Sequence, residues 1–114
     1  NTLWENSVSE SYYAMYNALQ AILFKNGIKC ENHTAAITLL NELLQQPELH
    51  HTIAFAKKER IDKQYYITFK LTQESAEDLV VKAEQFVLQM KTIILHLQNE
   101  QIEQYRKNLT SIIS

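Results

Sequence analysis

The sequence predicts an all-α protein, an antiparallel up-and-down bundle of four to five helices that forms a single domain over residues 1–114. The chain holds one glycine and one proline, too few for the tight turns that a sheet or barrel needs. Apolar residues recur every three to four positions along most of the chain, as on the buried face of a helix. A length of 114 residues leaves room for one hydrophobic core and not for two.

The first helix is predicted from residue 3 to residue 26. Its apolar residues recur at helical spacing and three tyrosines widen the stripe: Leu3, Val8, Tyr12, Tyr13, Met15, Tyr16, Leu19, Ile22 and Leu23. Gly27 follows this run directly, and glycine readily adopts the left-handed conformation that closes a helix. We therefore expect a break at Gly27 and a short connector over residues 28–31.

Two further helices are predicted on either side of Pro47. Asn32 is a good N-cap residue for a helix that reaches Leu44. Proline ends one helix and suits the first turn of the next, so a third helix is expected from Glu48 to about Lys63. Residues 65–69 are β-branched and aromatic, but no second strand-like run exists to pair with them, so we expect an ordered loop or a helix extension.

The longest unbroken periodicity predicts a fourth helix from Thr72 to Leu97. Thr72 is a plausible N-cap, and Glu74 lies in the first turn, where the helix dipole favours an anion. The apolar positions of this helix are Ala76, Leu79, Val80, Ala83, Phe86, Val87, Met90, Ile94 and Leu97. Residues 99–114 keep an apolar periodicity and either extend this helix or turn back as a fifth.

Composition excludes several function classes. A net charge of -2 provides no field that would draw the whole chain to nucleic acid or membrane, so such binding needs a local patch. The chain shows no apolar run of about 20 residues and no signal peptide, so we expect a cytoplasmic protein without membrane contact. A lone cysteine, Cys30, excludes a Cys-rich zinc site, and the single glycine excludes a phosphate-binding glycine loop.

One short segment of the sequence resembles a metal-binding motif. Residues 48–51 read Glu-Leu-His-His, which is half of the paired Glu-x-x-His pattern of di-iron bundles. The second half is missing, so the sequence predicts no metal site and no cofactor.

Three groups of side chains remain as candidates for function. The charged run at residues 57–63 is typical of a solvated helix face, but Arg60 has the forked guanidinium that binds phosphate through two hydrogen bonds. The tyrosines most often fill a core or an interface, and the alternative is a surface on which bases stack. His33 lies at a helix N-terminus, where the dipole disfavours its protonated form, and we expect it to pack on its neighbours.

Three segments follow one another along the chain: SYYAM at residues 11–15, GIKCENH at 27–33 and RIDKQYY at 60–66, followed by the helix that contains Phe86. Together they resemble the HEPN superfamily, in particular its small stand-alone prokaryotic branch, and the resemblance spans about residues 7–97. It implies an antiparallel helical bundle that usually pairs as a symmetric homodimer. Members include metal-independent RNA-cleaving toxins, commonly encoded beside a nucleotidyltransferase antitoxin, and non-catalytic nucleotide- or RNA-binding relatives.

The sequence departs from the ribonuclease members at one motif. Those members carry an arginine, four to six spacer residues and a histidine, whereas here Arg60 is followed at that distance by Tyr65, and no histidine follows until His96. A tyrosine with a pKa of roughly 10 transfers protons poorly near neutral pH. Some antitoxins add AMP to a tyrosine just beyond that histidine. Ile67 takes that place here, which leaves Tyr65 or Tyr66 by displacement.

A second departure is at the start. The family normally has one more amphipathic helix before the SYYAM helix, and this chain begins about where the second helix would, so we expect the first to be missing from it. If so, an apolar groove on the bundle would be covered by a partner chain or by the tail from Asn99 onward.

The preferred hypothesis is a dimeric HEPN module, at most weakly catalytic, that binds a nucleotide, RNA or a nucleotidyltransferase partner. One alternative is an active metal-independent ribonuclease toxin, and another is a purely structural helical interaction module. The candidate catalytic residues are Arg60, Tyr65 and His33, and the candidate ligand-binding residues are Lys57, Lys58, Arg60, Tyr65, Tyr66 and Asn32.

Overall fold

The computed structural model describes residues 2–65 and 73–113, with the backbone alone for residues 2 and 61–65. It contains five helices, α1 (Thr2–Lys25), α2 (His33–Glu42), α3 (Pro47–Tyr65), α4 (Gln73–Leu95) and α5 (Asn99–Ile113). The described ranges hold no strand, so the all-α prediction is confirmed. The predicted cap Thr72 and residues 66–69 lie outside the described residues.

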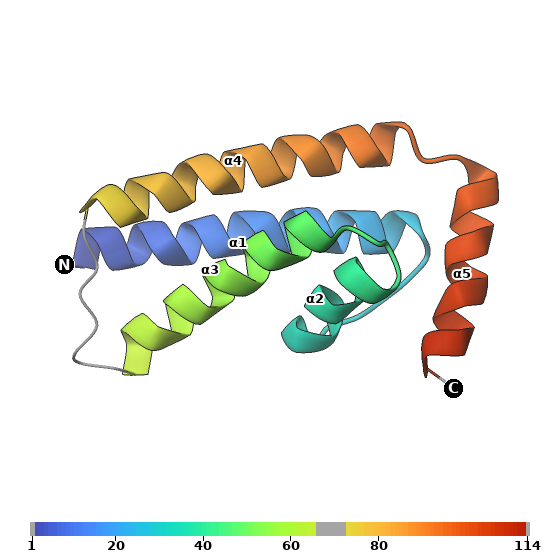
Figure 1. The fold of residues 1–114 in the computed structure, drawn as a ribbon, viewed down its shortest axis with the longest axis horizontal. Coiled ribbons are helices and arrows are strands. Elements are labelled where there is room, and N and C mark those ends of the chain that lie inside the picture. Colours follow the sequence, from blue (N-terminus) through green and yellow to red (C-terminus); the bar gives the residue numbers. More distant parts are fainter. Residues whose placement is uncertain (1, 66–72, 114) are drawn as a thin grey trace.

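The helices form an elongated bundle (Figure 1). Helix α3 runs back against α1, and α4 returns in the same direction as α1, so α1 and α4 are parallel neighbours. The short helix α2 lies beside one end of α3. Helix α5 turns away after residues 96–98 and crosses the end of the bundle, so of the two alternatives for the tail the structure shows a separate fifth helix.

Gly27 closes α1 as the sequence predicts. Its φ of 73° is left-handed, and the backbone N–H groups of Gly27 and Ile28 bond to the carbonyls of Phe24 and Leu23 at 2.9 and 2.8 Å. These two bonds define the Schellman motif, in which a glycine ends the helix and two otherwise free carbonyls are satisfied. The turn sends the chain back along α1 toward α2.

Asn32 caps α2, as predicted. Its backbone is extended, and its side-chain oxygen accepts a hydrogen bond of 2.9 Å from the backbone N–H of Ala35. The helix ends at Glu42, two residues before the predicted Leu44, and Gln45 then adopts a left-handed φ of 55°. Non-glycine residues rarely adopt this conformation, so nothing in the local sequence indicated the earlier end.

Removing the α2 cap is expected to destabilise the protein. Asn32→Ala leaves the Ala35 N–H without its side-chain acceptor, which typically costs about 1 kcal/mol in the free energy of unfolding. Urea denaturation would measure this loss. Asn32→Ser, which retains a capping oxygen, is the control, and an equal loss in both variants would contradict a capping role.

The core lies between α1, α2, α3 and α4. Its fully buried side chains include Tyr12, Met15, Leu19, Ile22, Leu40, Ile53, Phe86 and Met90. Leu3 was predicted to belong to the buried stripe of α1, but it is 71% exposed. It lies near the start of α1, where it lines the rim of a groove beside the first turns of α4.

Candidate functional site

Polar and aromatic side chains from three helices meet on one side of the bundle. Helix α1 contributes tyrosines, α2 contributes its first residue, and α3 contributes two cations. We call the set Tyr12, Tyr13, Tyr16, His33, Lys57 and Arg60 the tyrosine–arginine cluster.

Arg60 faces inward because it continues the buried stripe of α3. Leu49, Ile53 and Ala56 of that helix are buried, and Arg60 follows Ala56 by four positions, which places the two residues on the same helix face. Arg60, the residue that the sequence singled out from the charged run, therefore does not lie on a fully solvated helix face. Its side chain is partly buried against α1.

The Arg60 guanidinium lies over two tyrosine rings. Its central carbon is 4.9 Å from the ring centre of Tyr13 and 5.6 Å from that of Tyr12, within the range of cation–π attraction. The Nε atom is buried, and no described residue accepts a hydrogen bond from it. The rings thus hold the guanidinium in place, with its Nε enclosed and without an acceptor among the described residues.

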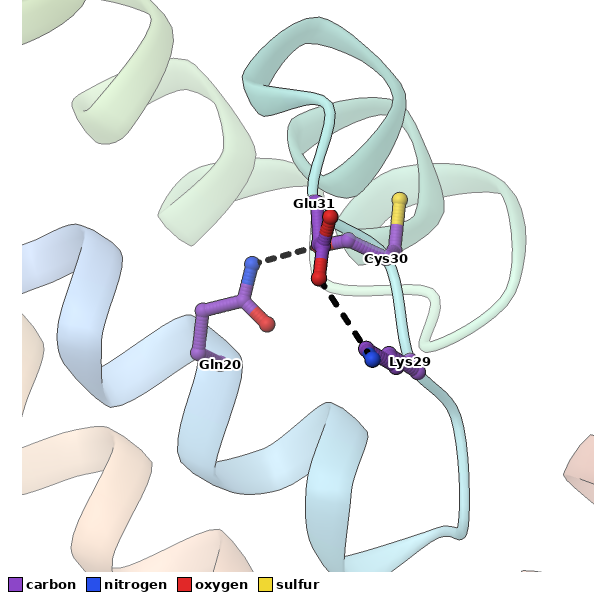
Figure 2. A network of polar contacts seen from close by, with 4 residues as sticks. All are labelled: Gln20, Lys29, Cys30 and Glu31. Atoms are coloured by element: carbon purple, nitrogen blue, oxygen red, sulfur yellow. Dashed lines mark hydrogen bonds and ion pairs between the residues drawn. The ribbon is translucent and has the colours of Figure 1, made fainter.

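His33 is fixed by Tyr12 and Tyr16. Its Nδ1 lies 2.7 Å from the Tyr12 hydroxyl oxygen, and its ring stacks on Tyr16 with ring centres 3.8 Å apart. Gln20 supports this arrangement, because its amide donates to the Tyr16 hydroxyl at 2.6 Å and to the Cys30 carbonyl at 2.7 Å. Figure 2 shows Gln20 reaching from α1 to the connector that precedes His33.

Burial and nearby charges set the protonation states in the cluster. Burial, followed by the neighbouring Tyr16, raises the pKa of Tyr12 to about 12. The pKa of His33 is lowered, first by burial and then by the positive charges of Arg60 and Lys57. The direction agrees with the sequence prediction, but the largest cause is burial and not the helix dipole. Near neutral pH, Tyr12 keeps its proton and His33 is uncharged.

Stability is expected to fall as the pH drops from about 7 to about 5, because His33 protonates more readily in the unfolded chain. Below its ordinary pKa of 6.5, the unfolded chain binds a proton that the folded protein does not, so the free energy of unfolding decreases. Urea denaturation at both pH values would measure the decrease. His33→Gln should show a smaller decrease, and an unchanged or larger one would contradict the assignment.

Only some of the predicted ligand-binding residues lie in the cluster. Lys57 joins the cluster, and its Nζ donates to the Thr34 hydroxyl at 2.6 Å. Lys58 is exposed, and it points away from Arg60 because residues two positions apart on a helix project about 200° apart. The side-chain oxygen of Asn32 is used as the helix cap. The side chain of Tyr65, at the end of α3, and all of Tyr66 lie outside what the structure describes.

Sequence reasoning missed Tyr12 as the partner of His33. The two residues are 21 positions apart, so no periodicity connects them. The available signal was the SYYAM segment with the Tyr16 that follows it, because the spacing of Tyr12 and Tyr16 places both side chains on one helix face.

Two further observations concern metal binding and membrane insertion. Among the described side chains, no group of three or more His, Cys, Asp or Glu residues is placed to hold a metal ion. Within the described helices, none combines the length and apolar character that crossing a bilayer requires.

The fold and the cluster together define a small helical-bundle protein that presents a positively charged aromatic site between three helices. Comparison with known proteins places it further. The family model of the HEPN domain matches residues 1–93, so the chain belongs to the HEPN family. A protein of Methanocaldococcus jannaschii named "Putative toxin" is 28% identical over 96 residues, which cover 80% of this chain and 71% of that protein. No solved structure gives a significant match.

Proposed function

We propose that this HEPN protein binds single-stranded RNA at the tyrosine–arginine cluster. The observation that carries the proposal is Arg60, whose guanidinium is held on the rings of Tyr12 and Tyr13 while the residue as a whole stays partly exposed. A guanidinium pre-positioned in this way is suited to donate to phosphate oxygens. The partly exposed ring of Tyr13 offers an adjacent face for a base.

The local charge favours an anionic ligand despite the net charge of -2. Lys57 and Arg60 both lie beside the N-terminus of α2, where the helix dipole adds positive potential. The lowered pKa of His33 is consistent with this potential, since the same two cations disfavour its protonation. A phosphate group placed here would meet three sources of positive charge.

The binding experiment measures the affinity for single-stranded RNA at several salt concentrations. Two phosphate contacts, from Lys57 and Arg60, predict that log K falls with log salt with a slope of about -1.4. Lys57→Ala should reduce the magnitude of this slope by about 0.7. Lys58→Ala is the matched control, because the neighbouring lysine projects away from the cluster. Salt-independent affinity, or equal effects of the two variants, would contradict the proposal.

RNA cleavage is the second candidate function, and the uncharged His33 favours it. When Nδ1–H donates to the Tyr12 oxygen, Nε2 retains a lone pair that can accept a proton. In such a reaction Nε2 takes the proton of the RNA 2′-hydroxyl, the 2′-oxygen attacks the adjacent phosphorus, and the 5′-oxygen leaves with a proton from solvent. Arg60 would stabilise the negative charge on the phosphate. His33 would then take the role that the family pattern gives to the histidine after the arginine.

Cleavage is tested with an RNA strand and with the same strand carrying a 2′-deoxy nucleotide at the cleaved position. A general base contributes roughly 10²–10⁴-fold, so His33→Ala should slow cleavage by about that factor while RNA binding persists. Tyr65→Phe tests whether Tyr65, and not His33, is the general base. Cleavage that survives His33→Ala but not Tyr65→Phe would reassign the role to Tyr65.

The homodimer and the nucleotidyltransferase partner that the family implies remain predictions. A symmetric homodimer predicts twice the monomer mass in light scattering. The name of the Methanocaldococcus relative is compatible with a toxin–antitoxin pair, and a nucleotidyltransferase reading frame beside the gene would support that assignment.

A further inference from the structure

The parallel helices α1 and α4 leave an apolar groove along one side of the bundle. One part has a volume of about 480 Å³, and a second part of about 400 Å³ continues it toward the N-terminus. The two parts share Ser7 and Glu10. Ser7, Ser11 and Ala14 on α1 have small side chains. They do not fill the space beside the larger side chains of α4, and this leaves the groove.

Helix α5 leaves this groove uncovered. The groove runs along residues 3–14 of α1 and 73–88 of α4, whereas α5 crosses the opposite end of the bundle (Figure 1). There Tyr105 and Leu109 pack against the core, and the Arg106 side chain lies beside Gly27. The sequence predicts that either a partner chain or the tail from Asn99 onward covers such a groove. In this structure the tail does not cover it.

Apolar side chains extend from the groove onto the exposed face of α4. Leu88 lines the groove and is 63% exposed, and Val81, one heptad earlier on the same helix, is 50% exposed. A seven-residue spacing presents both side chains to the same side. A helix laid in the groove would bury them.

The charges along the groove are of one sign. Glu10 lies on the α1 side, Glu84 on the α4 side, and Glu77 on the second part. Among the described lining residues there is no lysine, arginine or histidine. No described residue forms a hydrogen bond or ion pair with Glu10 or Glu84, so both carboxylates are available to an incoming cation.

From this geometry we propose that the α1/α4 groove docks a basic amphipathic helix of a partner protein. The apolar face of that helix would fill the groove over Ala14 and Val80, and lysine or arginine side chains on its flanks would pair with Glu10 and Glu84. A second copy of this chain is a poor occupant, because twofold pairing of this face would bring four of these carboxylates together and like charges at an interface oppose association. The groove is separate from the tyrosine–arginine cluster and does not depend on RNA binding.

The probes are two synthetic helical peptides of about five turns. Both carry leucines along one face; the flanks carry lysines in one peptide and glutamates in the other. Fluorescence anisotropy should show the lysine peptide binding at least about tenfold more tightly than the glutamate peptide. The double variant Glu10→Gln, Glu84→Gln should weaken the lysine peptide by about tenfold and remove most of the salt dependence of its affinity.

Matched variants identify where the peptide binds. Glu100→Gln with Glu103→Gln makes the same charge change on α5 and should leave the affinity unchanged. Ala14→Trp should block the groove and abolish binding, with circular dichroism as the check that the helices persist. Arg60→Ala should leave peptide binding unchanged, which separates this proposal from the RNA site.

Three outcomes would overturn the inference. The first is equal affinity for the two peptides or none for either. The second is unchanged binding after both glutamates are replaced. The third is a dimer in analytical ultracentrifugation that Leu88→Arg converts to a monomer, because the groove would then be occupied by a second copy of this chain.

Discussion

Arg60→Ala is expected to weaken RNA binding by about one to two orders of magnitude, because charge-assisted hydrogen bonds contribute about 1.5–3 kcal/mol each. The variant loses the guanidinium that lies on Tyr12 and Tyr13 and also removes one phosphate contact from the salt dependence. The RNA affinity of Arg60→Lys should lie between those of the unsubstituted protein and Arg60→Ala, since lysine keeps the charge but not the forked geometry. Fluorescence anisotropy with labelled RNA measures all three affinities.

Arg106→Ala provides the matched control for Arg60. It removes the same type of side chain from an exposed position on α5, where it lies beside Gly27 and is not part of the cluster. Circular dichroism should show the same helix content in both variants. Equal loss of affinity in the two variants would mean that binding depends on overall charge, and unchanged affinity in Arg60→Ala would refute the site.

Phe86→Ala is expected to destabilise the protein by about 3–5 kcal/mol, the usual cost of deleting a buried aromatic ring. Phe86 is 1% exposed and lies on the face of α4 that packs into the core. Small domains have a free energy of unfolding of about 5–15 kcal/mol, so the loss removes a large fraction of the total. Urea denaturation followed by circular dichroism measures it.

Leu95→Ala is the comparison for Phe86 on the same helix. Leu95 is 82% exposed, and substitutions at such surface positions usually change stability by less than about 0.5 kcal/mol. A similar loss in both variants would show that the core does not lie on the face that the structure assigns to it.

Local chemistry explains which parts of the fold the sequence predicts. Gly27, Asn32 and Pro47 each act through their own backbone or side chain, so their positions indicate where α1 ends and where α2 and α3 begin. The end of α2 depends instead on Gln45 adopting a left-handed conformation. Glutamine has no intrinsic preference for it, so tertiary packing decides that boundary.

The cluster was predictable only in part, for a similar reason. Arg60 continues the spacing of Leu49, Ile53 and Ala56, and this periodicity already indicates an inward direction. That Arg60 meets Tyr13, and that His33 meets Tyr12, depends on how three helices pack. Neither pairing has a local signature, because contacts between distant segments are set by the tertiary arrangement.

The hydrogen bond between Tyr12 and His33 has an evolutionary consequence. The Tyr12 side chain is completely enclosed, and a buried phenol without a partner costs about 1–3 kcal/mol. A relative that does not act on RNA would still lose stability by discarding His33. Persistence of this histidine among relatives would thus be expected from selection for folding alone, and only activity measurements distinguish enzymes from relatives that keep the pair as scaffold.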